Sequence, residues 1–114
     1  MLTEIITTNA EAPVMVLFGG NPIRRQEVLL LIKEIGGINA YATLSEKEGM
    51  EKLKALPRVD LVLIGGRYSG EERTRIKTFV DQNLPGTLVT EPGYDYPYDN
   101  TAIQMDIKEK LKIR

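Results

Sequence analysis

Two short apolar runs, each closed by a pair of glycines, constrain the fold of this chain more than any other feature. Val14–Phe18 and Leu61–Ile64 contain only apolar residues, and a Gly-Gly pair follows each of them. A strand that is apolar at every position is buried on both faces, as in the centre of a parallel sheet covered by helices. Glycine pairs are typical of tight turns at the ends of such strands. The two runs therefore predict the central strands of an α/β protein.

Capping signals predict where the helices begin. Asn21 is a favourable N-cap residue and Pro22 suits the first helical position, so a helix should start there and run to Ile35, before two glycines. Ser45 and Ser69 each precede a glutamate by three residues, which is the spacing of a capping box. These two serines predict the starts of a second and a third helix.

Two weaker strands and a last helix complete the pattern. Residues 38–43 alternate apolar and polar side chains, as an edge strand would, and residues 87–90 form a short fourth strand. Ile103, Ile107 and Leu111 recur at the spacing of one helix face.

The alternation of strands and helices predicts an α/β fold in three layers (αβα), with a four-stranded parallel sheet. Right-handed crossovers favour the flavodoxin-like strand order 2-1-3-4. A chain of 114 residues suffices for one domain, so we expect a single domain over residues 1–114. Residues 1–12 add either a short edge strand or a flexible lead-in, and the sequence alone leaves both open.

Composition excludes several kinds of chemistry. The chain has no Cys and no His, which rules out disulfides, thiolate sites and the commonest general base and metal ligand. The net charge of -1 argues against a general nucleic-acid partner. The apolar runs are far shorter than the roughly 20 residues that span a bilayer, and the N-terminus has no secretory signal pattern. We therefore expect a cytoplasmic protein with no membrane contact.

From residue 14 to about residue 91, some two thirds of the chain, the sequence resembles a response-regulator receiver domain. The resemblance is strongest over residues 37–66, GINAYATLSEKEGMEKLKALPRVDLVLIGG. There an edge strand leads into a helix with Glu48 and Leu53, and the strand DLVLI follows. The resemblance implies a receiver-like domain.

The acidic residues that would carry the chemistry of that family are absent from the matching positions. Receivers hold Mg²⁺ with an acidic pair after the first strand, where this chain has Gly19 and Gly20. Their phosphoacceptor Asp matches Gly65, and their Ser/Thr after the fourth strand matches Thr90. The resemblance thus implies a degenerate receiver that is not an enzyme. It would act as a signalling or protein-interaction module.

An alternative function is the binding of a small anion or nucleotide at the carboxyl edge of the sheet. In an open parallel sheet, ligands bind outside the carboxyl ends of the strands, where the strand order reverses. Backbone amides at glycine turns, a helix N-terminus and nearby arginines can hold an anion there. The candidate ligand-binding residues are Gly19, Gly20, Asn21, Arg24, Arg25, Gly65, Gly66, Arg67, Thr90, Tyr94 and Tyr96.

Two plainer interpretations remain open for these residues. The glycines can simply make tight turns, and the tyrosines of the loop at residues 91–100 can cover one end of the core. The run GGNPIRR matches neither common nucleotide-binding motif, so no cofactor is expected. Glu91, Asp95 and Asp99 carry oxygen ligands, but their spacing matches no calcium loop, and we expect no metal site.

The first helix carries two apolar residues on its polar side. Ile23 and Leu30 fall opposite the face formed by Val28, Leu31 and Ile32. Such residues are harmless surface scatter or a contact for a protein partner. A second copy of this chain is one such partner, which would make a homodimer.

Overall fold

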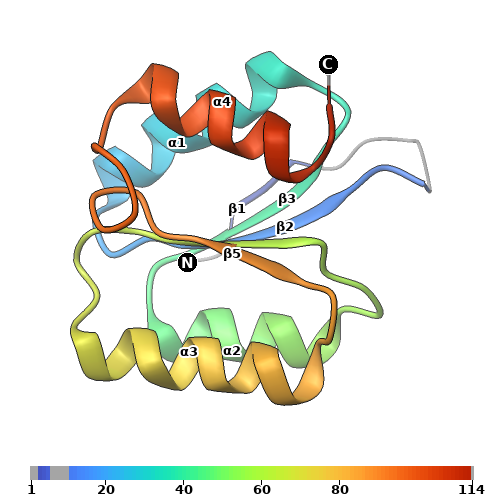
Figure 1. Cartoon of the computed structure of the whole chain (residues 1–114), viewed down its shortest axis with the longest axis vertical. Coiled ribbons are helices and arrows are strands. Elements are labelled where there is room, and N and C mark those ends of the chain that lie inside the picture. Colours follow the sequence, from blue (N-terminus) through green and yellow to red (C-terminus); the bar gives the residue numbers. More distant parts are fainter. Residues whose placement is uncertain (1–2, 6–10, 114) are drawn as a thin grey trace.

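The computed structural model describes residues 3–5 and 11–113, which form a five-stranded sheet in the order β1-β3-β2-β4-β5 (Figure 1). Strands β2 to β5 are all parallel. Their arrangement confirms the predicted order 2-1-3-4. The strands are β1 (Thr3–Ile5), β2 (Val14–Phe18), β3 (Asn39–Thr43), β4 (Leu61–Ile64) and β5 (Leu88–Thr90).

The sheet edge differs from the expectation for residues 38–43. Strand β1 pairs antiparallel with β3, with Thr3 opposite Ala42 and Ile5 opposite Ala40. Strand β3 therefore has a neighbour on each side and is not an edge strand. Of the two alternatives for residues 1–12, residues 3–5 take the edge strand, whereas residues 1–2 and 6–10 lie outside the described part of the chain.

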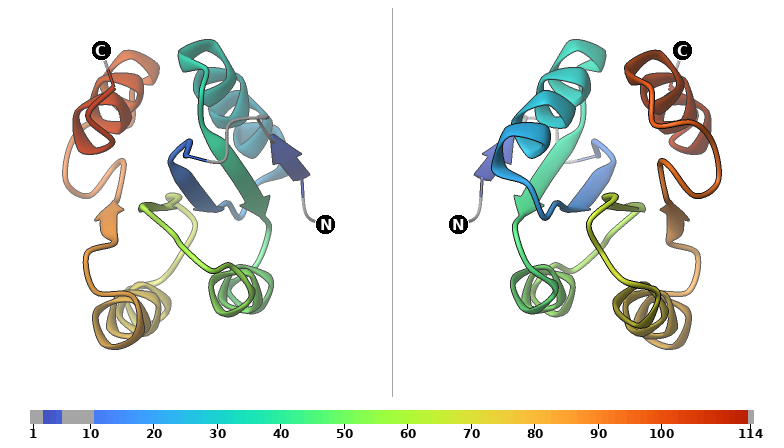
Figure 2. Two further views of the ribbon diagram at one scale, coloured as in Figure 1. Left: turned by 90° about the vertical axis from the view of Figure 1, so that its right-hand side faces the viewer. Right: turned by 90° about the vertical axis from the view of Figure 1, so that its left-hand side faces the viewer.

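Two helices cover each face of the sheet, which gives the three expected layers (Figures 1 and 2). Helices α1 (Pro22–Ile35) and α4 (Asn100–Lys110) lie side by side on one face. Helices α2 (Glu46–Ala55) and α3 (Gly70–Asn83) cover the other. Within the described residues, no helix is long and apolar enough to cross a membrane.

The alternating side chains of β2 supply both halves of the core. Met15 and Leu17 pack with Ile103 in the cluster under α1 and α4. Val16 and Phe18 belong to the cluster under α2 and α3. These four of the five β2 side chains are at most 1% exposed, because the strand lies at the centre of a sheet that is covered on both faces.

The helix starts follow the predicted caps, with one difference. The Asn21 side chain accepts hydrogen bonds from the first turn of α1, and Ser69 forms a complete capping box with Glu72. At α2 only half of the box forms. Ser45 caps the helix, but the Glu48 carboxylate accepts from the Leu44 amide at 2.8 Å instead of from the Ser45 amide.

Candidate functional site

A crevice opens at the carboxyl edge of the sheet, between the ends of β2 and β4. These two strands are parallel neighbours, so the turns that follow them lie next to each other. The crevice has a volume of about 150 Å³. It is lined by Leu17, Gly19, Gly20, Asn21, Arg24, Arg25, Val28, Gly65, Gly66, Arg67 and Tyr98.

Close packing requires glycine at some positions of this edge and not at others. A Cβ at Gly20 would lie 2.8 Å from the Cβ of Arg67, and one at Gly65 would lie 3.0 Å from the Phe18 carbonyl oxygen. These glycines therefore allow the two turns to approach closely, which is the plainer of the two interpretations. Gly66 is different, since a Cβ there would meet only the Tyr98 ring at 3.7 Å. Packing does not require glycine at that position.

Three arginines line the crevice, and no Asp or Glu of the described part of the chain does. Arg24 is held in place by Glu27 at 3.1 Å and by the Asn100 side chain at 2.8 Å, and its guanidinium lies 4.4 Å from the centre of the Tyr98 ring. Arg25 is 8% exposed. The crevice is thus a positively charged site with fixed geometry around Arg24.

Arg67 is the cation of the crevice that has no acidic partner among residues 3–5 and 11–113. Two glutamates share a neighbouring surface groove with it, but each is engaged elsewhere. Glu46 pairs with Arg75 at 2.6 Å, and Glu72 accepts from the Ser69 amide at 2.8 Å. The Arg67 guanidinium is therefore available to a ligand.

The N-terminus of α1 lies at the crevice, but the backbone amides of its first turn already have hydrogen-bond acceptors. The amides of Ile23 and Arg24 donate to the Asn21 side chain at 2.9 and 3.2 Å, and the Arg25 amide donates to the Asn21 carbonyl at 2.8 Å. Pro22 has no N–H to offer. These amides already have hydrogen-bond acceptors, so the positive charge at this edge comes from the arginine side chains.

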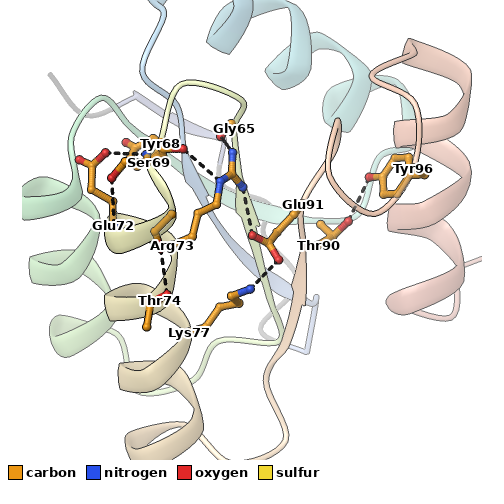
Figure 3. A network of polar contacts seen from close by, with 11 residues as sticks. Gly65, Tyr68, Ser69, Glu72, Arg73, Thr74, Lys77, Thr90, Glu91 and Tyr96 are labelled. Atoms are coloured by element: carbon orange, nitrogen blue, oxygen red, sulfur yellow. Dashed lines mark hydrogen bonds and ion pairs between the residues drawn. The ribbon is translucent and has the colours of Figure 1, made fainter.

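The structure places three candidate residues outside the crevice. Thr90 is fully buried and bonds to the Tyr96 hydroxyl at 3.0 Å (Figure 3). It also bonds to the Asp106 carboxylate. This network ties β5 to α4, and burial raises the pKa of Tyr96 to about 12. Tyr94 lies over Arg73, with 3.7 Å between the guanidinium carbon and the ring centre.

Tyr98 takes the place in the crevice that Tyr94 and Tyr96 were expected to take. It comes from the same loop, and its ring lies beside Gly66 and Gly93. Sequence reasoning missed it because the loop holds three closely spaced tyrosines and the choice among them depends on its turns. The left-handed φ of 87° at Gly93 is one such turn.

Beside the crevice lies a buried ionic cluster that sequence reasoning also missed (Figure 3). Arg73 is 2% exposed and donates to the Gly65 carbonyl at 2.7 Å, to the Tyr68 carbonyl at 3.1 Å and to Glu91 at 3.0 Å. Lys77 adds a second bond to Glu91, at 3.0 Å. Burial acts to raise the pKa of Glu91, but the bonds from Lys77 and Arg73 hold it below its usual value. The cluster fixes the turn after β4 to α3 and β5.

A metal centre does not assemble in the described ranges. Among residues 3–5 and 11–113, no group of three or more His, Cys, Asp or Glu side chains is arranged to hold a metal ion. Glu91, the first acid of the loop, is engaged by two cations.

Comparison with known proteins identifies the fold. No family model matches the sequence, and no curated protein matches it either. The structure is similar to that of a response regulator from Thermotoga maritima, with a TM-score of 0.71 and 17% sequence identity. The match covers 89% of this chain and 98% of that one. The chain therefore has a receiver-like, flavodoxin-like fold.

Proposed function

We propose that this receiver-like domain is a signalling or protein-interaction module that performs no phosphotransfer. The proposal depends on one observation above all. Among the described residues that line the crevice where β2 and β4 end, three are arginines and none carries a carboxylate. Acyl-phosphate formation needs a carboxylate oxygen to attack phosphorus, and a bound Mg²⁺ needs oxygen ligands beside it.

The position after β4 supports the same interpretation. Gly65 occupies the place where a nucleophilic Asp would be expected from the resemblance, and a Cβ there would approach the Phe18 carbonyl oxygen to 3.0 Å. The Gly65 carbonyl is in addition held by the buried Arg73. Both contacts favour a turn that is fixed by packing.

The test is incubation with acetyl phosphate and Mg²⁺, followed by intact-mass measurement. We expect the mass to stay unchanged. A stable gain of one phosphoryl group, mapped to an aspartate such as Asp60 or Asp95, would contradict the proposal.

An interaction role is supported by apolar side chains on the outer face of α1. Ile23 is 77% exposed and Leu30 is 61% exposed. Met105 of the adjacent α4 is 65% exposed. Exposed large apolar residues on one side of a small domain favour a protein partner, here an unknown protein or a second copy of the chain.

A second candidate function is the binding of a small anion in the crevice. The observation that favours it is the set of three arginines with no acidic residue among the lining side chains. Titration with inorganic phosphate, followed by NMR of the Gly20 and Gly66 amides, tests this function directly. Joint movement of the two amides would support it.

A further inference from the structure

The crevice has an apolar side as well as a charged one. The apolar surface that it offers a ligand includes the ring of Tyr98, which is 36% exposed, whereas Leu17 and Val28 also line the crevice but are each only 1% exposed. Hydrated inorganic ions gain nothing from such a surface, whereas an organic ligand buries apolar area against it. The lining therefore suits an anion that carries an apolar body.

The volume of the crevice limits the size of the ligand. The volume of about 150 Å³ equals that of a protein cavity that takes up benzene, at about 150 Å³. Sites for larger ligands have roughly 300–1,000 Å³. A nucleotide is therefore too large for this crevice, and a single ring or a short branched chain fits.

The charge favours a single negative group. Arg24 already shares its charge with Glu27. Burial acts to raise the pKa of Glu48, but the hydrogen bond from the Leu44 amide and, as a smaller contribution, the charge of Arg25 help to lower it below its usual value. The charge of Arg25 thus already acts on a carboxylate. Arg67 is left to bind the ligand, and one planar guanidinium matches one carboxylate through two parallel hydrogen bonds.

We propose that the crevice between the ends of β2 and β4 binds a small organic carboxylate, with its apolar body against the Tyr98 ring and its charged group on Arg67. This inference rests on the second candidate function and specifies its ligand class. Gly66 leaves the crevice open, which explains a glycine that packing does not require.

The experiment uses the whole chain, labelled with ¹⁵N, and three probes. Benzoate carries the expected combination of ring and carboxylate. Benzamidinium has the same ring with the opposite charge, and inorganic phosphate has the charge without the apolar body. We expect benzoate to move the Gly20 and Gly66 amides saturably, benzamidinium to leave them in place, and phosphate to bind more weakly than benzoate.

Two variants and a matched control complete the test. Arg67→Gln should weaken benzoate binding about tenfold, since it removes a charge-assisted pair. Gly66→Ala should weaken it too, because the added methyl group enters the crevice. Gly70→Ala, whose Cβ would meet nothing within 4 Å, should leave affinity unchanged.

The outcomes separate this inference from the functions on which it depends. Equal binding of benzamidinium and benzoate, or unchanged affinity in Arg67→Gln, would overturn the carboxylate site. Amides that respond to phosphate but not to benzoate would also overturn it, while keeping the anion-binding function. If neither benzoate nor phosphate moves the Gly20 and Gly66 amides, the carboxylate site and the anion-binding function are both wrong. The proposal of a module without phosphotransfer is then judged by the acetyl phosphate assay alone.

Discussion

Gly49 offers a sharp test of how α2 packs on the sheet. It lies inside the helix, where Gly→Ala ordinarily stabilises a protein by about 1 kcal/mol. Here the added Cβ would lie 2.1 Å from Cε2 of the Phe18 ring, well inside van der Waals contact. Phe18 is fully buried, and its ring meets Tyr68 edge-on at 6.0 Å, so it has little room to turn away.

The expected sign of Gly49→Ala is therefore reversed. Overpacking of a well-filled core costs about 1–3 kcal/mol. At the upper end of that range, subtracting the helix-propensity gain leaves a net loss of about 2 kcal/mol in the free energy of unfolding. Urea unfolding followed by far-UV circular dichroism measures this loss as a lower midpoint at an unchanged slope.

A matched variant and a double mutant separate the clash from other effects. Gly70→Ala adds the same methyl group to α3 with no neighbour within 4 Å, so its stability should be unchanged or higher. Phe18→Leu should partly rescue Gly49→Ala, with a favourable coupling of about 1 kcal/mol or more. A Gly49→Ala protein as stable as the Gly70→Ala protein, or strictly additive effects with Phe18→Leu, would refute this account of the packing.

Three further predictions concern other parts of the molecule. Lys112 has a left-handed φ of 57° just after α4, so Lys112→Gly should raise the free energy of unfolding by about 1 kcal/mol, and an unchanged urea midpoint would contradict this. Burial acts to raise the pKa of Glu91, but bonds from two cations lower it overall. The ionised Glu91 side chain therefore stabilises the fold above its unfolded-state pKa near 4.5, and this contribution is lost as the pH falls through the lower folded-state pKa. Glu91→Gln should thus cost about 3 kcal/mol at neutral pH and flatten the acid limb of the stability curve, whereas an equally steep limb would count against the reasoning. Finally, we expect the chain to self-associate through Ile23 and Leu30, which sedimentation velocity measures. The double variant Ile23→Lys/Leu30→Lys should stay monomeric, and a wild-type protein that stays monomeric at every concentration would rule out that contact.

Most of the fold could be predicted because its signals are local. The apolar runs of β2 and β4 and the caps at Asn21, Ser45 and Ser69 each depend on a few adjacent residues. The antiparallel strand β1 could not be decided in this way. Its three residues pair with β3 through a contact some forty residues away, and a stretch this short carries little periodicity.

The location of the candidate site in the fold was predictable, because the strand topology determines it. Parallel neighbouring strands bring their carboxyl ends together, so the glycine turns and the arginines that follow them had to lie at one edge. Side-chain partners were not predictable. Arg73 and Glu91 are separated by the rest of α3, one loop and strand β5, and nothing in either sequence segment indicates that they pair in the interior.

The cluster around Arg73 and the crevice around Arg67 show how two arginines six residues apart differ in their surroundings. Arg73 points from α3 into the protein, where two carbonyls and a carboxylate accept its hydrogen bonds. A charge at that depth is tolerated only because every one of those bonds is made, so its function is to hold the turn after β4. Arg67 lies on that turn itself, is exposed, and meets no acid in the described part of the chain. The buried arginine thus fixes the position of the turn, and the exposed one on it is the group to which we assign the proposed anion.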